Sequence, residues 1–136
     1  MTRSGRARGM TLMELMIALA IVAILAALAY PSYRDSLMRG RRTDAIGSLL
    51  ALRVAQERWR ANHTAYADLR ELGYADTSQD GYYRLRVLER SAAGFLAIAQ
   101  PRADGPQRGD ACGTYAVDQR GPLLTGGYAG AACWRR

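Results

Sequence analysis

An uncharged, apolar stretch of 19 residues between Glu14 and Arg34 constrains this chain more than any other feature. A helix of that length measures about 28 Å at about 1.5 Å per residue, close to the thickness of a bilayer's hydrocarbon core. The stretch therefore predicts a helix that crosses a membrane or packs among other apolar helices. The remainder, about 100 residues, is long enough for one small folded domain.

Two ordinary explanations of the apolar stretch compete with a specialised helix. A secretory signal peptide also has a cationic start, and residues 26–29, Ala-Ala-Leu-Ala, are similar to its small-residue cleavage site. A signal peptide has a shorter apolar region, however, whereas this one continues into a helical pattern whose only turn signal is Pro31. A plain single-span anchor leaves Glu14 unexplained, because a carboxylate inside a bilayer costs about 2.5–3.5 kcal/mol and usually has a function.

A short cationic segment precedes the apolar stretch. Residues 1–9, MTRSGRARG, contain three arginines and no acid, which favours an N-terminus that stays in the cytoplasm. The whole chain has a net charge of +7, and its basic residues are all arginine. Taking the leader's Arg3, Arg6 and Arg8 from the 19 basic residues leaves 16 against 12 acids, or +4. The remainder is only mildly basic, which is weak support for a nucleic-acid or membrane-surface partner.

The helical pattern continues past the apolar stretch and predicts one long helix over residues 10–61. Five apolar residues of its second half recur at steps of three and four and form one stripe: Ala45, Leu49, Leu52, Ala55 and Trp59. The helix is therefore expected to be apolar all round in its first half and amphipathic in its second. Pro31 lies inside it and is expected to kink or loosen it.

The region after the long helix has the pattern of an α+β domain. Residues 66–72 predict a short helix that ends at Gly73. Apolar and charged side chains alternate over residues 82–89, which predicts a half-buried strand, and further strands are expected at residues 95–100 and 112–119. The glycine-rich tail from Thr125 is expected to have little intrinsic order.

The chain has two cysteines, Cys112 and Cys133, both near the C-terminus. One even pair in a small exported domain usually forms a disulfide. Zinc would need two further ligands, and the only histidine, His63, is far away in sequence. If the chain is exported, we expect a disulfide that closes a loop of about 22 residues and stabilises the domain by about 3 kcal/mol.

Catalytic and cofactor motifs are not recognisable in the sequence. There is no Ser/His/Asp set, no cluster of metal ligands and no phosphate-binding loop, since the glycines near residue 127 have no lysine and follow no suitable strand. His63 is a lone histidine in a connecting segment and is expected to be structural or solvated. We therefore expect a protein that is not an enzyme and that has no metal site or cofactor.

The residues from Gly9 to Leu15, Gly-Met-Thr-Leu-Met-Glu-Leu, resemble the type IV prepilin motif, and residues 31–33, Pro-Ser-Tyr, look like its continuation. The resemblance implies cleavage after Gly9 by a prepilin peptidase and methylation of the new amino group on Met10. It also implies the type IV pilin (ladle) fold, in which one long N-terminal helix packs on a C-terminal antiparallel sheet of about three to four strands. Most members have Phe where this chain has Met10; both side chains are large and apolar, so we expect processing to occur.

The resemblance divides the chain into a leader (residues 1–9), a transmembrane and filament-core half of the helix (residues 10–33) and a globular domain with a C-terminal disulfide loop (residues 34–136). The segment YADLRELGY, the strand pair, and CGTYAVDQ with the later CW also look like PilE-type minor pilins, a group that includes the DNA-uptake pilin ComP. In that group the cysteine pair would bound the disulfide loop.

Glu14 needs a partner once it is buried among packed helices. Cleavage would create one, since the Met10 amine is a new positive charge, and the resemblance implies that a neighbouring subunit supplies it. Losing one member of a buried pair costs about 3–5 kcal/mol, so Glu14 is expected to set the register of subunit addition. Six alanines in the stretch would permit close helix approach, although alanine is also a simple helix former: Ala18, Ala20, Ala23, Ala26, Ala27 and Ala29.

Three functions are compatible with these features. The first is a structural subunit, a minor one, of a type IV pilus or fimbrium, serving assembly, adhesion or twitching motility. The second is a DNA-binding pilin for natural transformation, with contacts from Arg84, Arg86, Arg135 and Arg136 and with Tyr82 or Trp134 for stacking. The third is a pseudopilin of type II secretion, against which the cysteine pair argues because the family associates that loop with pilins.

The expected partners and location follow from the resemblance. Other pilin subunits would contact the N-terminal helix, and the prepilin peptidase and the inner-membrane assembly machinery would act on the precursor; DNA is a further candidate partner. The precursor would lie in the inner membrane with its globular domain in the periplasm, and the assembled subunit in an extracellular pilus.

Overall fold

The computed structural model describes residues 9–135, so leader residues 1–8, with their three arginines, and Arg136 lie outside the described residues. The elements follow in the order α1 (Leu12–Arg60), β1 (Tyr83–Arg90), β2 (Phe95–Pro101), β3 (Tyr115–Asp118) and α2 (Ala131–Trp134). The chain divides into two units, residues 1–36 and residues 37–136. The predicted long helix is confirmed as α1, and it runs through Pro31 without a break in its helical assignment. A bend at Pro31 stays a prediction.

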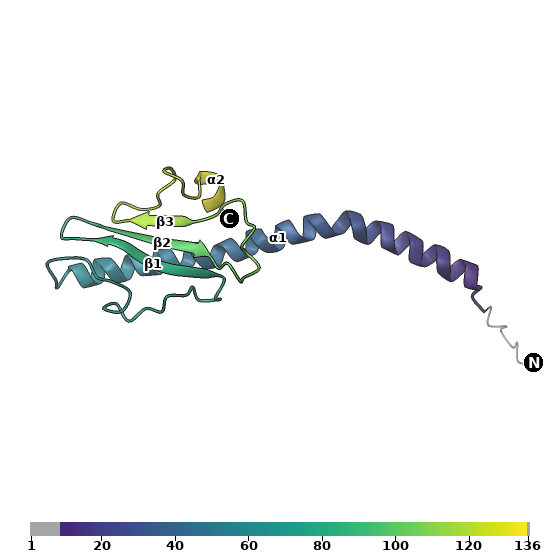
Figure 1. Cartoon of the computed structure of the whole chain (residues 1–136), viewed down its shortest axis with the longest axis horizontal. Helices are drawn as coiled ribbons and strands as arrows, with labels where there is room; N and C mark the ends of the chain where they lie inside the picture. Colours follow the sequence, from purple (N-terminus) through teal and green to yellow (C-terminus); the bar gives the residue numbers. More distant parts are fainter. Residues whose placement is uncertain (1–8, 136) are drawn as a thin grey trace, which may run out of the picture. The chain divides into compact units, whose positions relative to one another are not determined.

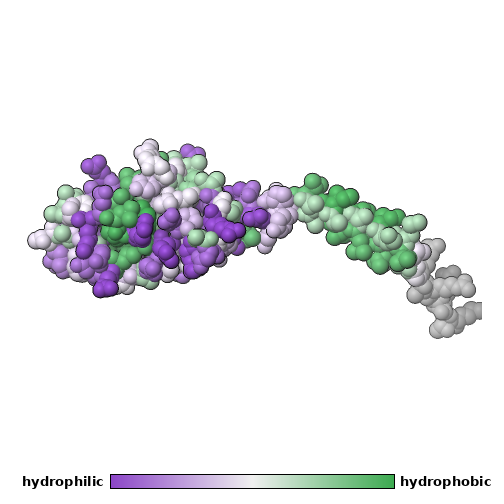
Figure 2. Space-filling view, viewed as in Figure 1, coloured by the Kyte–Doolittle hydropathy of each residue, from purple (hydrophilic) through white to green (hydrophobic). Residues whose placement is uncertain are grey.

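In the first unit, α1 exposes the whole apolar stretch. Large side chains such as Leu12, Leu19 and Leu28 keep more than half of their surface exposed. Figure 2 shows this part of α1 as a continuous hydrophobic surface. Its length and mean hydropathy of 2.7 satisfy the requirements of a membrane-crossing helix. The helix therefore carries an unusually large apolar surface that only lipid or other protein can cover.

In the second unit, the later half of α1 packs on a three-stranded antiparallel sheet in the order β1-β2-β3 (Figure 1). The register pairs Leu85 with Ala99 and Ala99 with Tyr115 across the three strands. The expected fold is thus confirmed, with three strands. The β1–β2 ladder is interrupted by a bulge between Val87 and Glu89, and Leu88 is the extra residue.

The core lies between the second half of α1 and the inner face of the sheet. On α1, Ala45, Leu49 and Leu52 of the predicted stripe are fully buried. Further along the helix the buried position is taken by Gln56, and Ala55 and Trp59 are only half-buried. The sheet contributes a second set: Tyr83, Leu85, Phe95, Ala97, Ala99, Tyr115 and Val117. The core cluster and the disulfide all come from residues after position 44, so the second unit contains a complete core.

Two local predictions were wrong, and the tail, which was expected to have little intrinsic order, gains its order from contacts with the rest of the domain. Residues 66–72 form turns and no helix; the buried pair of hydrogen bonds between Gln56 and the backbone of Ala67 holds this segment against α1 instead. The third strand covers Tyr115–Asp118 only, because the preceding residues turn around the disulfide. The tail is ordered by pairing with β3: Leu123 and Ala129 donate backbone hydrogen bonds to Ala116 and Thr114, and α2 follows.

Candidate functional site

The first candidate site is the start of α1. Gly9 and Met10 are exposed, and two-thirds of the Met10 surface is accessible. The Thr11 Oγ1 accepts a hydrogen bond from the Glu14 N–H at 3.2 Å, which satisfies one of the free N–H groups at the helix start. Thr11 and Glu14 thus have the spacing of a capping box, a signal of a helix start that the sequence already contains.

Glu14 lies in the first turn of α1, where a carboxylate is favoured by the helix dipole. Among the described residues of one chain, no cation pairs with the Glu14 carboxylate, and the surface around it is apolar. This arrangement leaves the carboxylate available for a positive group on another molecule.

The second candidate site is the arginine surface of the sheet. Arg84 and Arg86 lie on the exposed face of β1, as predicted, and neither side chain has an ion pair or hydrogen bond with the described residues. Arg84 lies directly opposite Gln100 in the ladder. A hollow of about 330 Å³ beside Arg84 is also lined by Gln100, Arg102 and Asp104.

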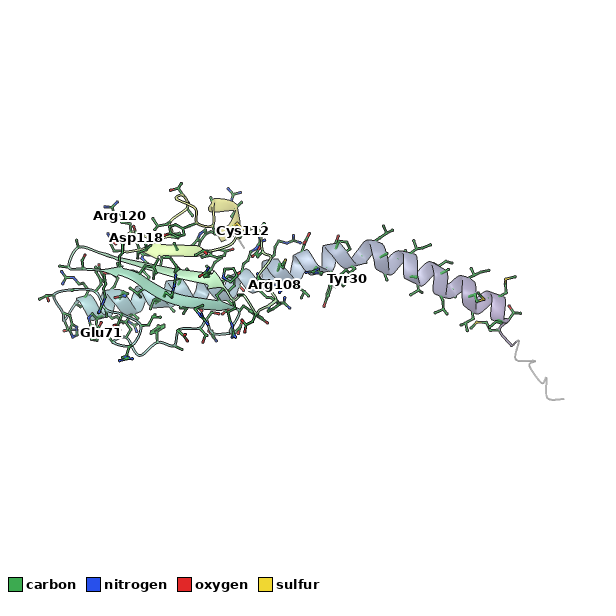
Figure 3. The ribbon with its side chains drawn as sticks, in the orientation of Figure 1. Tyr30, Glu71, Arg108, Cys112, Asp118 and Arg120 are labelled. Carbon is green, nitrogen blue, oxygen red and sulfur yellow. A yellow bond between two sulfur atoms is a disulfide. The ribbon has the colours of Figure 1, made fainter. Side chains whose placement is uncertain are left out.

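Other arginines near this surface are already neutralised. Arg102 pairs with Asp104 at 2.8 Å, and this hydrogen bond holds the pKa of Asp104 below its usual value. Arg90 forms ion pairs with Asp68 and Glu71. Figure 3 labels Glu71, on the connector below the sheet. The free charge of the sheet is therefore concentrated at Arg84 and Arg86.

The predicted stacking residues are not available as flat platforms. Trp134 packs edge-on against Tyr115 at 5.3 Å and donates its indole N–H to the Ala129 carbonyl. Tyr82 is covered by the Arg41 guanidinium, 5.2 Å from the ring centroid. Arg135 is exposed at the end of the described chain, and Arg136 lies outside it. His63 stacks on Trp59 with centroids 3.7 Å apart, which supports its predicted structural role.

A buried polar network, which the sequence analysis missed, holds the loop after β2 against α1. The Arg42 guanidinium binds both carboxylate oxygens of Asp110, whose side chain is fully buried. This hydrogen bonding raises the pKa of Arg42. Gln107 donates to the Met38 carbonyl, the Tyr83 hydroxyl and Asp110. Burial raises the pKa of the Tyr83 hydroxyl to about 12.

The disulfide between Cys112 and Cys133 joins the end of this loop to α2, with Cα atoms 5.8 Å apart. The Cys112 N–H donates to Asp110, and the Tyr115 hydroxyl donates to the Cys133 carbonyl. Figure 3 shows Cys112 at one end of β3 and Asp118 and Arg120 at the other. Burial also raises the pKa of Tyr115. Among the described residues no group of three or more His, Cys, Asp or Glu side chains could hold a metal ion.

Comparisons with known proteins place this geometry in a family. The family profile described as "Type IV minor pilin ComP, DNA uptake sequence receptor" matches residues 31–116, more than half of the chain. The chain belongs to the type IV pilin family. A second profile, the prokaryotic N-terminal methylation motif, matches residues 4–30 of this pilin and contains Gly9, Met10 and Glu14.

Named relatives agree with the family. The pilin is 35% identical over 100 residues to the type IV major pilin protein PilE1 of Neisseria gonorrhoeae, covering 72% of this chain and 45% of PilE1. It is 39% identical over 82 residues to the major pilin PilA of Myxococcus xanthus, covering 59% of this chain and 37% of PilA. The pilin thus spans less than half the length of either relative.

A solved type IV pilin from Shewanella oneidensis has the same fold. The two structures superpose with a TM-score of 0.52 over 73% of this chain and 99% of that one, at 24% sequence identity.

Proposed function

We propose that this pilin is a structural, minor subunit of a type IV pilus. The observation that carries the proposal is the start of α1: an exposed Gly9–Met10 pair, a capped first turn with an unpaired Glu14, and an exposed apolar surface. In the filament, helices of neighbouring subunits would cover the apolar surface. A neighbour's Met10 amine would pair with Glu14.

The proposed route has two stages. The precursor first lies in the inner membrane through residues 10–33, with leader residues 1–9 in the cytoplasm and the globular unit in the periplasm. A prepilin peptidase then cleaves after Gly9, the Met10 amine is methylated, and the assembly machinery moves the subunit into an extracellular pilus that serves adhesion or twitching motility.

Mass spectrometry of sheared pili tests the proposal directly. We expect a subunit that begins at Met10 and carries one methyl group on its amine. Its amount relative to the principal subunit measures whether it is minor. Absence of the chain from pili, together with its presence in a secretion-type pseudopilus, would favour the pseudopilin alternative.

The role of Glu14 needs a matched pair of variants. Glu14→Ala should be inserted and cleaved normally but be absent from sheared pili, because a neighbour's amine loses its partner. Glu57→Ala removes an exposed acid from the second half of the same helix and should be incorporated like the parent chain. Normal incorporation of Glu14→Ala would contradict the register role.

A second candidate function is DNA binding for natural transformation. It is supported by the description of the matching family profile and by the unpaired, exposed Arg84 and Arg86. Because phosphate contacts release counterions, affinity should fall with salt, and Arg84→Glu/Arg86→Glu should reduce the salt slope by about 2.

A gel-shift titration of residues 34–136 is suitable, since this fragment contains the complete core and disulfide but no leader arginines. Arg58→Glu is the control, because Arg58 is an exposed arginine on α1 with no partner among the described residues. The absence of salt-sensitive binding at micromolar protein would reject this function.

A further inference from the structure

We propose that the end of the globular unit at which α1 enters it binds the anionic phospholipid headgroups of the membrane that holds the precursor. Three arginines from separate elements define this basic end: Arg41 on α1, Arg108 on the loop after β2 and Arg135 after α2. They follow the apolar stretch, opposite the cationic leader, so the rule that places positive charge in the cytoplasm does not account for them. The inference rests on the membrane-inserted precursor of the proposed function.

The loop after β2 places Arg108 beside the first turn that α1 contributes to this unit. The unit begins at Leu37, and the Gln107 side chain donates to the Met38 carbonyl at 3.1 Å. Arg108 is the next residue in the loop, and it is exposed. Figure 3 shows Arg108 at this end of the unit. Arg108 and Arg41 therefore both lie near the point at which α1 enters the unit.

The disulfide brings Arg135 to the same end. Cys112 follows Arg108 in the loop, and its bond to Cys133 joins the loop to α2 with Cα atoms 5.8 Å apart. Arg135 comes directly after α2 and is exposed. The helix, the loop and the tail thus contribute one arginine each to one part of the surface.

The acids near the basic end do not balance these three arginines. Two of them pair with other arginines, Asp104 with Arg102 and Asp110 with Arg42. Asp44 is buried and holds the loop before β1. No acid of this part of the described chain is therefore left to neutralise the basic end.

The arginines of the basic end keep their charge available to a ligand. The Arg41 guanidinium lies over the Tyr82 ring, 5.2 Å from its centroid, a contact that leaves the charge without a counter-ion. The side chains of Arg108 and Arg135 have no ion pair or hydrogen bond among residues 9–135. An anionic surface would supply the missing counter-charge.

Chain connectivity keeps the basic end close to the membrane. The apolar stretch ends before Arg34, and Arg41 follows Arg34 by about 10 Å of helix, about one Debye length at 0.1 M salt. Asp35 and Arg39 lie between them, four residues apart, and their opposite charges offset each other. Binding of headgroups at the basic end would hold the globular unit at the membrane until the subunit is extracted.

Flotation of the fragment of residues 34–136 with lipid vesicles tests this surface. The probes are vesicles of phosphatidylcholine alone and mixed vesicles of phosphatidylcholine and phosphatidylglycerol. We expect binding to the mixed vesicles only, weakening as salt is added. Arg41→Gln/Arg108→Gln/Arg135→Gln should weaken it at least tenfold, because each arginine near an anionic membrane surface contributes a factor of about five.

A matched control removes the same charge from other parts of the unit. Arg58→Gln/Arg70→Gln/Arg120→Gln replaces three exposed arginines whose side chains have no partner among the described residues. Arg58 is near the end of α1, and Arg120 lies at the other end of β3 from Cys112 (Figure 3). We expect this variant to bind the mixed vesicles nearly as well as the parent fragment. Equal losses in the two triple variants would mean that binding follows net charge alone and would overturn the proposal.

Two tryptophans report the same contact in the full chain. Trp134 precedes Arg135 at the basic end, whereas Trp59 follows Arg41 by about 27 Å of helix. In nanodiscs with a nitroxide on a lipid headgroup, Trp59→Phe leaves Trp134 as the reporter, and Trp134→Phe leaves Trp59. We expect phosphatidylglycerol to increase the quenching of Trp134 at least twofold and that of Trp59 not at all. Quenching of Trp134 that does not respond to phosphatidylglycerol would contradict the proposal.

Duplex DNA is the competing ligand. If the parent fragment binds DNA through Arg41, Arg108 and Arg135 and does not bind the mixed vesicles, the basic end is a nucleic-acid contact and the proposal is wrong. The vesicle assay does not involve pilus assembly, so absence of the chain from sheared pili would reject the proposed subunit role without changing this result.

Discussion

Two buried carboxylates on or against α1 organise separate loops of the globular unit. Asp44 accepts hydrogen bonds from the Ser78 hydroxyl at 2.5 Å and from the backbone of Asp80 at 3.0 Å, which holds the loop before β1. Asp110 makes the opposite kind of connection: it lies in a loop, and it accepts hydrogen bonds from Arg42 on α1. Residues 42 and 44 of one helix turn thus fix two chain segments far apart in sequence.

Replacing Asp110 should destabilise the domain strongly. Asp110→Asn leaves the partly buried Arg42 without its counter-charge, and we expect the free energy of unfolding to fall by about 3 kcal/mol. This value is at the low end for a broken buried pair, because about a fifth of the Arg42 side chain is exposed. Urea unfolding of residues 34–136 measures the change in the free energy of unfolding. Arg42→Met/Asp110→Leu removes both charges and should cost clearly less; an equal cost would show that packing, not charge, decides the effect.

The buried tyrosines predict the alkaline limit of the fold. Burial raises the pKa of Tyr83 from about 10 when unfolded to about 12 when folded. The folded state therefore holds the Tyr83 proton more tightly than the unfolded state does. The stability that the protonated Tyr83 contributes is complete below pH 10 and is lost as the pH rises from 10 to 12.

Absorbance of tyrosinate against pH checks this prediction. Tyr83 should ionise only near pH 12, and Tyr115, whose pKa burial also raises, should ionise no earlier, unless the domain unfolds first. Tyr83→Phe should flatten the fall in stability between pH 10 and 12, and an unchanged pH profile would contradict the assignment.

At the scale of elements, patterns that repeat along the chain could be predicted and contacts that join distant segments could not. The step of three and four located Ala45, Leu49 and Leu52, and the alternation located Tyr83 and Leu85. The end of the buried stripe was predicted at Ala55 and Trp59, but Gln56 is the buried residue because it pairs with the backbone of Ala67. A contact of this kind between distant segments leaves no periodic pattern in the sequence. The loop before Cys112 is polar and has no periodic pattern that would place a residue in the core, yet Gln107 is fully buried because its partners lie on α1 and β1.

The disulfide should stabilise the unit through the elements it joins. Cys112→Ser/Cys133→Ser releases a closed loop of about 22 residues, and we expect a loss of about 3 kcal/mol. Thermal unfolding of the oxidised and reduced parent chain should reproduce the difference, and the double variant should not respond to reductant. A stability unchanged by the substitutions would mean that pairing of residues 122–129 with β3 suffices to hold the tail.

At the scale of the whole molecule, the sequence motif located the start of α1 but not its local geometry. Gly9, Met10 and Glu14 could be singled out by type and spacing, and the apolar stretch is exposed as expected. Alternation along the strand placed Arg84 and Arg86 on the exposed face, but it could not report that the neighbouring Arg90 and Arg102 are neutralised by acids near them in space or in sequence.

Processing should depend on a small residue before the scissile bond. Gly9→Leu places a bulky side chain there, and we expect membranes to retain a precursor that still carries the nine-residue leader, as measured by intact-mass spectrometry. Met10→Phe keeps a large apolar residue after the bond and should be cleaved like the parent. Cleavage of Gly9→Leu at the parental rate would argue that the protease does not require a small residue at this position.

The chain itself covers both edges of the sheet, and this protects the subunit from pairing through its strands. Residues 122–129 cover the β3 edge, and residues 76–78 cover the β1 edge from Tyr83 to Leu85, which leaves a short opening at Val87. Strands with long open edges can add to one another without end, as in amyloid stacks. A single open position is too short to accept another strand, so this sheet cannot nucleate a polymer of its own.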